Sequence, residues 1–469
     1  MEFPDSVGVR VLPSAEIEAD NRKHMKNRVL SYNLTCFLYS SLYLEGISEI
    51  LILVPVMPYS TRLLSLLIFI LLFLSSCFSF GQGSTEQEDR VRVGAENFMD
   101  SRLDEVAGLR LGLVMNPTAR IGERHVLDLL LETEARVSAL FAPEHGFRGE
   151  AGAGDKIEDG VDQESGLPVY SLYGENRKPT QAMLEQIDLL IFDMQDVGAR
   201  FYTYIATLGG VIESAAEAGI PIWILDRPNP AGGDYVSGWL LEKELESFVG
   251  PYPIPIAHGL TMGEIARMMV GERWIDFDVE PDLEVVEMEG WKREMKWPDT
   301  GLNWVPPSPN LPTFEHAYFY LGNVFYEGTT MSEGRGTEDP FLTLGDPGVR
   351  LDDSQLEYLQ SLSESILVEH TEFIPHSIPG VAPNPKHQGV RCYGVKSRIK
   401  DYNFDPVRTG LEIFTTLFNA AEDVEIRSFL YLLAGTREID RIIEGELSAM
   451  EADFELEPYM EQRKPYLLY

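Results

Sequence analysis

Four short, mostly apolar segments, three of which lead into clusters of polar residues, limit this chain to a small group of folds. Near-continuous apolar runs of this kind are typical of strands that are buried on both faces of a parallel sheet. In open α/β sheets, the loops that follow the carboxyl ends of such strands bind ligands. The segments span residues 111–115, 136–141, 187–193 and 221–225.

Helical spacing of apolar residues appears between and after these segments. Residues 124–131 have this spacing, and a predicted helix over residues 207–218 is stopped by Gly219. Thr261 begins a further helix as its N-cap, with Glu264 at the capping-box position. Strands that alternate with helices predict an α/β fold with a Rossmann-like, mostly parallel sheet.

A second, smaller α+β domain is expected to follow, because the periodicity loosens after residue 271 and a proline-rich stretch appears. We predict a Rossmann-like catalytic domain over residues 92–275. We predict a smaller accessory domain over residues 276–469, which contributes to the cleft and contains amphipathic helices near residues 411–420 and 429–433.

The chain is strongly acidic, with 75 Asp and Glu against 38 Lys and Arg and a formal net charge of -37. Nucleic acid is therefore not an expected partner, because binding to phosphates requires a basic surface. The three cysteines are Cys36, Cys77 and Cys392. Since only Cys392 lies in the globular part, the fold must be held there by its core, without an intradomain disulfide.

Residues 1–91 are expected to form a leader and a polar tether. Within them, residues 63–73 are an apolar run too short for a comfortable membrane span, which predicts an export signal over about residues 57–81. The following Leu-Ser-Ser-Cys77 resembles a lipobox, in which the cysteine is acylated, and ordinary cleavage after Gly81 is the alternative. We expect an exported protein, either periplasmic or attached to the membrane as an envelope lipoprotein.

The loop after the second apolar segment combines polar side chains with residues that shape the backbone. It spans residues 141–150 and places Glu144, His145 and Arg148 between Pro143 and two glycines. Proline fixes φ and glycine permits positive φ, so such a loop can direct side chains toward a ligand. An incidental charged turn is the alternative interpretation.

Several kinds of catalytic site have no motif in this sequence. There is no Walker loop, dinucleotide-binding glycine pattern, His-Glu-x-x-His metal motif or Gly-x-Ser-x-Gly nucleophile motif. We therefore predict neither a metal nor another cofactor. Glycoside cleavage by paired carboxylates remains, since one carboxylic acid must protonate the leaving oxygen. Carboxylates in suitable loops are Glu144, Asp193, Asp196, Asp226 and Glu333.

Glu144 is the candidate general acid, because the apolar residues beside it disfavour an ionised carboxylate. Asp193 or Asp196 is the candidate second carboxylate. Tyr202 belongs to an aromatic cluster that can stack on a sugar face. Arginines in the same loops indicate an anionic ligand, although each is also explained by a structural salt bridge. They are Arg148, Arg200, Arg227 and Arg335.

Long motifs in the chain resemble the bacterial exo-β-N-acetylmuramidase family, long catalogued as a domain of unknown function. The resemblance extends from about residue 110 to the end of the chain. The motifs are Asn116-Pro-Thr118, Pro143-Glu-His-Gly-Phe-Arg-Gly149, Leu167-Pro-Val-Tyr-Ser-Leu-Tyr-Gly174, Phe192-Asp-Met-Gln-Asp-Val-Gly-Ala-Arg-Phe-Tyr-Thr-Tyr204, Leu225-Asp-Arg-Pro-Asn-Pro230, Ser308-Pro-Asn310, Glu327-Gly-Thr329 and Ser332-Glu-Gly-Arg-Gly336.

This resemblance implies release of terminal N-acetylmuramic acid from the non-reducing end of peptidoglycan fragments during cell-wall recycling. The family's proposed catalytic glutamate falls on Glu144. Its partner is Asp193, Asp196 or the acetamido group of the substrate. An arginine, either Arg335 or Arg200, is expected to pair with the lactyl carboxylate that N-acetylglucosamine lacks. The substrate-binding candidates are His145, Arg148, Arg200, Tyr202, Arg227, Asn229, Asn310, Glu333 and Arg335.

Two other classes of function compete with this one. A non-catalytic envelope protein would bind muropeptides through the same cleft without cleaving them. An esterase or amidase acting on muropeptides is disfavoured, because the expected nucleophile and metal motifs are missing from the sequence.

Overall fold

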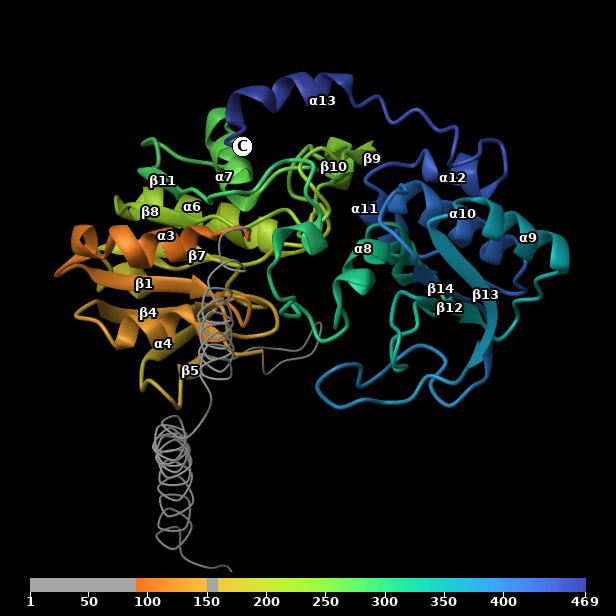
Figure 1. Cartoon of the computed structure of the whole chain (residues 1–469), viewed down its shortest axis with the longest axis horizontal. Coiled ribbons are helices and arrows are strands. Elements are labelled where there is room, and N and C mark those ends of the chain that lie inside the picture. The colour runs from red at the N-terminus through yellow and green to blue at the C-terminus, as the bar shows by residue number, and fades with distance from the viewer. Residues whose placement is uncertain (1–89, 150–158) are drawn as a thin grey trace, which may run out of the picture. The chain divides into compact units, whose positions relative to one another are not determined.

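A seven-stranded sheet forms the core of the first part of the chain (Figure 1). Its central strands coincide with the predicted apolar segments. The strand order is β11-β8-β7-β1-β4-β6-β5, and each neighbouring pair is parallel except β5 with β6. The predicted α/β class is confirmed. The strands are β1 (Arg110–Met115), β4 (Arg136–Ala142), β5 (Gly160–Val161), β6 (Pro168–Ser171), β7 (Leu189–Asp193), β8 (Ile222–Leu225) and β11 (Leu283–Val286).

This computed structural model describes residues 90–149 and 159–469. The predicted export signal and Cys77 lie outside the described residues. Within the described residues, no helix has both the length and the apolar character needed to cross a membrane. Cys392 is a buried free thiol.

Both faces of the sheet are buried, because alternate residues of β1 enter different apolar clusters. Leu111 and Leu113 belong to one cluster, whereas Val114 belongs to the other. Burial on both faces explains why these strands appear as continuous apolar runs in the sequence. The helices of this part are α3 (Gly94–Ser101), α4 (Val126–Leu131), α5 (Gln181–Leu184), α6 (Tyr204–Ala218) and α7 (Met262–Gly271). Short elements beside them are β2 (Arg120–Ile121), β3 (Arg124–His125), β9 (Ser237–Leu240), β10 (Pro255–Ala257), η2 (Leu103–Val106), η3 (Lys243–Leu245) and η4 (Trp297–Thr300).

The predicted stop of α6 and start of α7 are confirmed at the level of single contacts, whereas α6 begins at Tyr204, three residues before the predicted start. The Thr261 hydroxyl accepts a hydrogen bond from the Glu264 backbone N–H at 3.2 Å, and the Glu264 carboxylate accepts one from the Thr261 N–H at 3.0 Å. Helix α6 ends at Gly219, whose φ of 66° lies in the left-handed region that favours glycine. Local capping chemistry thus fixes where these helices stop and start.

A smaller antiparallel sheet, in the order β12-β14-β13, lies in the C-terminal part and is accompanied by several helices. The predicted second α+β unit is therefore confirmed as a fold class. Strand β11 lies after residue 275 yet pairs with β8 in the larger sheet, and the expected boundary at 275/276 stays a prediction. The elements are α8 (Phe314–Asn323), η5 (Val324–Gly328), β12 (Thr343–Asp346), α9 (Asp353–Ser361), β13 (Ile366–Phe373), β14 (Cys392–Ile399), α10 (Pro406–Asn419), α11 (Phe429–Ala434), α12 (Ile439–Ile443), α13 (Glu457–Gln462) and η6 (Lys464–Tyr466).

Helices α8 and α10 approach each other closely because both carry a glycine at the contact. A Cβ atom added to Gly410 would lie 2.3 Å from the carbonyl carbon of Gly322, so a larger residue would force the helices apart. This contact fixes α8, which carries Tyr320 toward the cavity described below.

The strand order of the sheet changes direction between β1 and β7. From β1 the chain proceeds to β4 and β6 on one side, and then returns to β7, β8 and β11 on the other. In open α/β sheets such a reversal of direction is where ligands bind. The loops after β4 and β7 both contribute residues to the cavity described below, as predicted from the polar residues at the ends of both strands.

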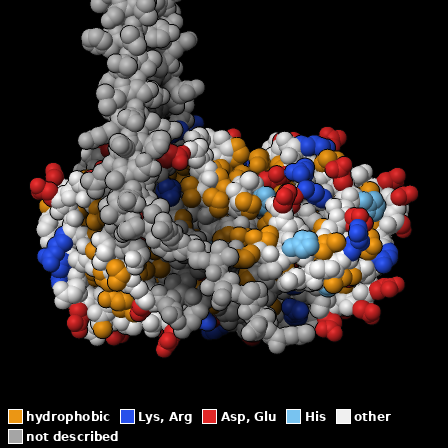
Figure 2. Space-filling model, turned by 90° about the horizontal axis from the view of Figure 1, so that it is seen from below, with side chains coloured by type: hydrophobic (Ala, Val, Ile, Leu, Met, Phe, Trp, Pro, Cys, Tyr) orange, Lys and Arg blue, Asp and Glu red, His pale blue; other side chains and the backbone are white. Residues whose placement is uncertain are grey.

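Charged side chains of both signs lie on the face of the molecule that Figure 2 shows. On the face shown in Figure 2, acidic and basic side chains are intermixed, and acidic ones lie around its outline. This distribution agrees with a solvating role for the acidity of the chain.

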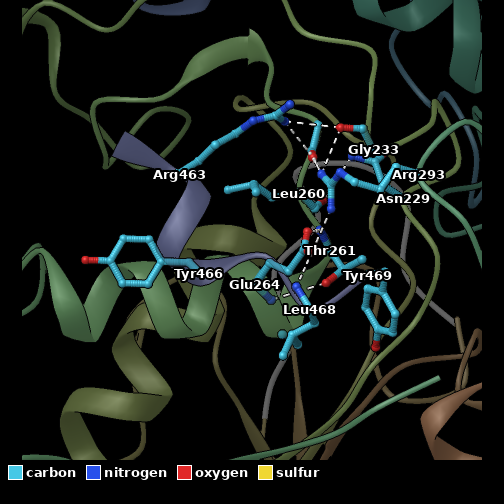
Figure 3. Close-up of polar contacts among 12 residues, drawn as sticks. Asn229, Gly233, Leu260, Thr261, Glu264, Arg293, Arg463, Tyr466, Leu468 and Tyr469 are labelled. Carbon is cyan, nitrogen blue, oxygen red and sulfur yellow. Dashed lines mark hydrogen bonds and ion pairs between the residues drawn. The ribbon is translucent and has the colours of Figure 1, made fainter. Parts of the chain in front are cut away.

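The end of the chain returns from the C-terminal part to the larger sheet. Helix α13 leads back toward α7 (Figure 1), where the Arg463 guanidinium donates to the carbonyl oxygens of Gly233 and Gly259 at 3.1 and 2.9 Å. The Leu468 N–H and Arg293 both donate to the Glu264 carboxylate, at 2.9 and 2.7 Å (Figure 3). The last residues therefore fasten the C-terminal part onto the sheet.

Asp226, directly after β8, is an ionisable residue at this contact between the end of the chain and the sheet. Its carboxylate accepts hydrogen bonds from the hydroxyls of Thr261 and Tyr469, at 2.7 and 2.9 Å. Burial raises the pKa of Asp226 from 3.8 to about 7, although the bonds from Thr261, the Gly263 N–H and Tyr469 oppose that rise. The folded protein thus holds the Asp226 proton more tightly than the unfolded chain does.

Asp226 is expected to make stability depend on pH between about 4 and 7. A group whose pKa is raised on folding stabilises the fold below its unfolded pKa and loses that contribution as the pH rises through the folded value. Relative to Asp226→Asn, the free energy of unfolding of the wild type should fall by at most about 1.4 kcal/mol per pH unit across this window. Urea denaturation of both proteins measures the difference. A difference independent of pH would contradict the assignment.

Candidate active site

A cavity of about 640 Å³ lies between the loop after β4 and residues of the C-terminal part. A volume of this size is typical of small-molecule binding sites. Five of the residues predicted for the site line it: Glu144, His145, Tyr202, Glu333 and Arg335. The loops after β4 and β7 are thus brought together with the segment 332–336, which contains the candidates Glu333 and Arg335.

The loop that carries Glu144 has the shaped backbone that its sequence predicts. Gly146 and Gly149 both have a φ of 85°, and the Gly146 N–H donates to the Pro143 carbonyl at 3.1 Å. His145 has a φ of 74°, a conformation that is uncommon outside glycine and costs roughly 1–2 kcal/mol. Strained backbone of this kind concentrates at functional sites, where the surrounding structure holds it in place.

Two hydroxyl groups hold the carboxyl group of Glu144. The Thr203 hydroxyl donates a hydrogen bond to Glu144 Oε2 at 2.8 Å. Tyr173 is also hydrogen-bonded to Glu144, and burial, the charge of Glu144 and this bond together raise the pKa of Tyr173 to about 12. Tyr173 therefore keeps its proton at neutral pH. Thr203 and Tyr173 also line the cavity, so they fix the direction of a carboxyl group that faces it.

The opposite wall of the cavity carries a cluster of paired charges. Arg335 contacts Glu327 at 2.6 Å and Glu333 at 3.5 Å. Lys386 contacts Glu333 at 2.9 Å, and its ammonium group also donates to the carbonyl oxygens of Tyr326 and Met331. Two carboxylates are therefore neutralised by two cations within this wall.

Aromatic side chains form the floor between the two walls. The Phe201 ring meets the Tyr320 ring edge-on at 5.2 Å, and Tyr320 meets Phe341 at 4.8 Å. The pKa of Tyr320 is raised well above its ordinary value, first by burial and then by charges that include Glu327 and Glu144. The negative charges of carboxylates in both walls thus contribute to the raised pKa of Tyr320. Aromatic faces of this kind offer stacking surfaces for a sugar ring.

Asp193, a predicted catalytic residue, does not line the cavity. It is fully buried at the end of β7 and forms a bidentate pair with Arg227, whose Nη2 lies 2.9 Å from Asp193 Oδ2. Arg227, predicted to bind substrate, also donates to the Arg120 carbonyl at 3.1 Å. These contacts are those of a buried structural ion pair that joins the loops after β7 and β8.

Asp196, Asn229 and Asn310 are likewise buried outside the cavity lining. Asp196 Oδ2 accepts a bond from the Gly198 N–H at 2.6 Å and lies 3.4 Å from His258 Nε2. The Asn229 amide donates to the Leu260 carbonyl at 3.0 Å and accepts from a neighbouring backbone N–H. The Asn310 amide donates at 2.9 Å to the carbonyl of residue 381, which itself lines the cavity. These side chains support the loops around the site.

Arg148 and Arg200, two of the predicted substrate-binding residues, are held by partners within the chain and do not line the cavity. Arg148 is paired with Asp162 at 2.7 Å, and this bond, more than any other influence, holds the pKa of Asp162 at about 2. Arg200 is fully buried and donates to the carbonyl oxygens of Trp239, Ile254 and Leu433. Burial lowers the pKa of Arg200 to about 9. Arg200 therefore joins the first part of the chain to α11 and is not exposed to a ligand.

Several lining residues have no role predicted from the sequence. Thr203 and Tyr173 lie inside the family motifs, and their hydroxyl groups are the signal that points to them as partners of a carboxyl group. Lys386 and Arg427 lie in segments without a distinctive pattern, so only the folded chain places them at the site.

Comparison with known proteins places both parts of the chain in one family. Residues 111–315 match the family model described as exo-β-N-acetylmuramidase NamZ, N-terminal, and residues 318–469 match its C-terminal counterpart. A peptidoglycan β-N-acetylmuramidase NamZ of Bacillus subtilis (strain 168) is 40% identical over 399 residues, covering 83% of this chain and 94% of that protein.

Two solved structures of DUF1343 family proteins from Bacteroides fragilis NCTC 9343 are also similar. The first is 31% identical, with a TM-score of 0.72, and the match covers 81% of this chain and all of that one. The second is 35% identical, with a TM-score of 0.67 and coverage of 81% and 99%. The fold and the sequence therefore point to the same group of proteins.

Proposed function

The chain belongs to the exo-β-N-acetylmuramidase family of glycoside hydrolases, and we propose that it releases terminal N-acetylmuramic acid from the non-reducing end of peptidoglycan fragments. One observation carries the proposal. The Glu144 carboxyl group is held by Thr203 and Tyr173 at the wall of an aromatic-lined cavity. A fixed carboxyl group beside a sugar-sized cavity is what protonation of a glycosidic oxygen requires.

Glu144 is the proposed general acid, and the second role belongs to the substrate. The other carboxylates of the described lining, Glu327 and Glu333, are held in ion pairs with Arg335 and Lys386, and we assign them the role of holding this wall. The acetamido oxygen of the sugar therefore attacks C1 while the C1–O bond breaks and the Glu144 proton passes to the leaving oxygen. Water then opens the resulting oxazolinium ring, and the Glu144 carboxylate accepts the proton of that water.

This mechanism retains the β configuration of the released sugar, because C1 is attacked twice. The experiment offers the wild type two defined disaccharides of N-acetylmuramic acid and N-acetylglucosamine, one with each sugar at the non-reducing end. We expect cleavage only where N-acetylmuramic acid is non-reducing, with the β-anomer as the first product in a proton NMR time course. Binding of both disaccharides without turnover would contradict the proposal and support the non-catalytic alternative.

We further propose that the protein acts outside the cytoplasm on peptidoglycan, as a periplasmic or envelope lipoprotein. The support is the apolar run at residues 63–73 and the lipobox-like Leu-Ser-Ser-Cys77. Mass spectrometry of the mature amino-terminal peptide distinguishes an acylated Cys77 from cleavage after Gly81, and recovery of an uncleaved leader from native protein would exclude both.

A further inference from the structure

Arg427 is a positive side chain at the cavity that the described acidic residues leave unneutralised. It lines the cavity and is exposed. Across residues 90–149 and 159–469, its guanidinium has no ion pair or hydrogen bond. By contrast, Arg335 and Lys386 in the same wall are held by Glu327 and Glu333. With Glu144 protonated, the described lining has three cations, Arg335, Lys386 and Arg427, against two carboxylates, Glu327 and Glu333. The remaining positive charge would be balanced by an anionic ligand.

The backbone beneath Arg427 is fixed, although its side chain is exposed. The Arg427 N–H donates to the Gly328 carbonyl at 2.8 Å, and Ile426 pairs with Thr329 as an antiparallel bridge. A Cβ atom added to Gly328 would lie 2.4 Å from the Leu430 Cα, so the two segments are in close backbone contact. Because the backbone is already fixed, only the Arg427 side chain has to be ordered when a ligand binds.

We propose that Arg427 binds the lactyl carboxylate of N-acetylmuramic acid and so makes the cavity selective for this sugar over N-acetylglucosamine. The inference rests on the proposed function. The two sugars differ by a lactyl ether on C3, which carries the carboxylate. When C1 lies beside Glu144, the lactyl ether on C3 projects from another side of the sugar ring, away from the general acid. A guanidinium group is the side chain best suited to bind a carboxylate through two parallel hydrogen bonds.

Arg427 takes the role that the sequence interpretation gave to Arg335 or Arg200. Arg200 is fully buried and bound to three carbonyl oxygens. Arg335 lies between Glu327 and Glu333, which already balance its positive charge. Arg200 is therefore closed to a ligand, and Arg335 adds no net positive charge to the wall.

The test measures binding in a Glu144→Gln background, so that turnover does not affect the result. The ligands are the methyl β-glycosides of N-acetylmuramic acid and N-acetylglucosamine, and the methyl ester of the former, which lacks the negative charge. Arg427→Ala is expected to weaken binding of the charged glycoside by about 10- to 100-fold, because a charge-assisted hydrogen bond is lost. The two neutral ligands should bind as before, and Arg427→Lys should recover part of the loss.

Arg437→Ala is the matched control. Arg437 is another exposed arginine of the same region, stacked 4.3 Å above the Tyr431 ring and outside the cavity lining. Its replacement should leave binding of all three ligands unchanged. Added salt should weaken binding of the charged glycoside alone, since an exposed ion pair is screened.

Two results would overturn the inference: unchanged binding of the charged glycoside by Arg427→Ala, or an equal loss for all three ligands. The proposed function is judged separately, by turnover of the wild type. A protein that cleaves muramic disaccharides but shows either result retains its function and loses this assignment. A protein that binds the charged glycoside through Arg427 yet never cleaves retains this assignment and loses the function.

Discussion

Replacement of Glu144 by glutamine is expected to lower kcat on a muramic disaccharide by about 10³-fold, because the glycosidic oxygen then leaves without a proton. Glutamine has almost the same shape and still accepts the hydrogen bond from Thr203. KM should therefore change little, and the free energy of unfolding should stay within about 0.5 kcal/mol of the wild type. Steady-state kinetics and urea denaturation measure the two effects.

Glu175→Gln is the control for this substitution. Glu175 is an exposed glutamate two residues beyond Tyr173 and is not among the cavity-lining residues. Its replacement makes the same change of side chain near the site without touching the cavity, so kcat should be unchanged. If Glu175→Gln reduced turnover as much as Glu144→Gln, the loss would reflect the local field and not proton donation.

Replacement of Asp193 by asparagine is expected to cost about 3–5 kcal/mol of stability, because it leaves the buried Arg227 guanidinium without a compensating charge. Asp193 is fully buried and Arg227 is 6% exposed, so water cannot replace the lost partner. The fraction that remains folded should keep the kcat of the wild type, since neither residue lines the cavity. Chemical denaturation gives the free energy, and active-site-normalised kinetics gives kcat.

The double variant Asp193→Asn/Arg227→Met removes both charges and should recover part of the lost stability. The alternative from the sequence alone was that Asp193 acts beside Glu144 in catalysis. That alternative requires the opposite pattern: Asp193→Asn would lower kcat strongly and change the free energy of unfolding little.

The sequence predicts the framework well where local chemistry decides the structure. Continuous apolar runs follow from burial on both faces of the sheet, and they located β1, β4, β7 and β8. The capping box at Thr261 and the left-handed stop at Gly219 depend only on neighbouring residues. The loop around Glu144 is similar, because its glycines reveal the backbone that they permit.

The hydrogen-bond and ion-pair partners of polar side chains are harder to predict from the sequence. A residue at the end of a strand can point into a cavity or into the core, and the local sequence is the same in both cases. Asp193 and Glu144 both follow apolar strands, yet only Glu144 faces the cavity. Arg200 reaches the Leu433 carbonyl across 233 positions of the chain, a contact that no local pattern indicates. Arg427 belongs to a short connection before α11, and its role depends on which neighbouring charges are already paired.

The most direct test of Glu144 as the acid compares two leaving groups in the Glu144→Gln variant. The 2,4-dinitrophenyl β-glycoside of N-acetylmuramic acid releases a phenolate that needs no proton, whereas the disaccharide releases a sugar alkoxide that does. We predict that the variant cleaves the dinitrophenyl glycoside within about 10-fold of the wild type while its rate on the disaccharide is about 10³-fold lower. An equal loss of rate on both substrates would contradict the account.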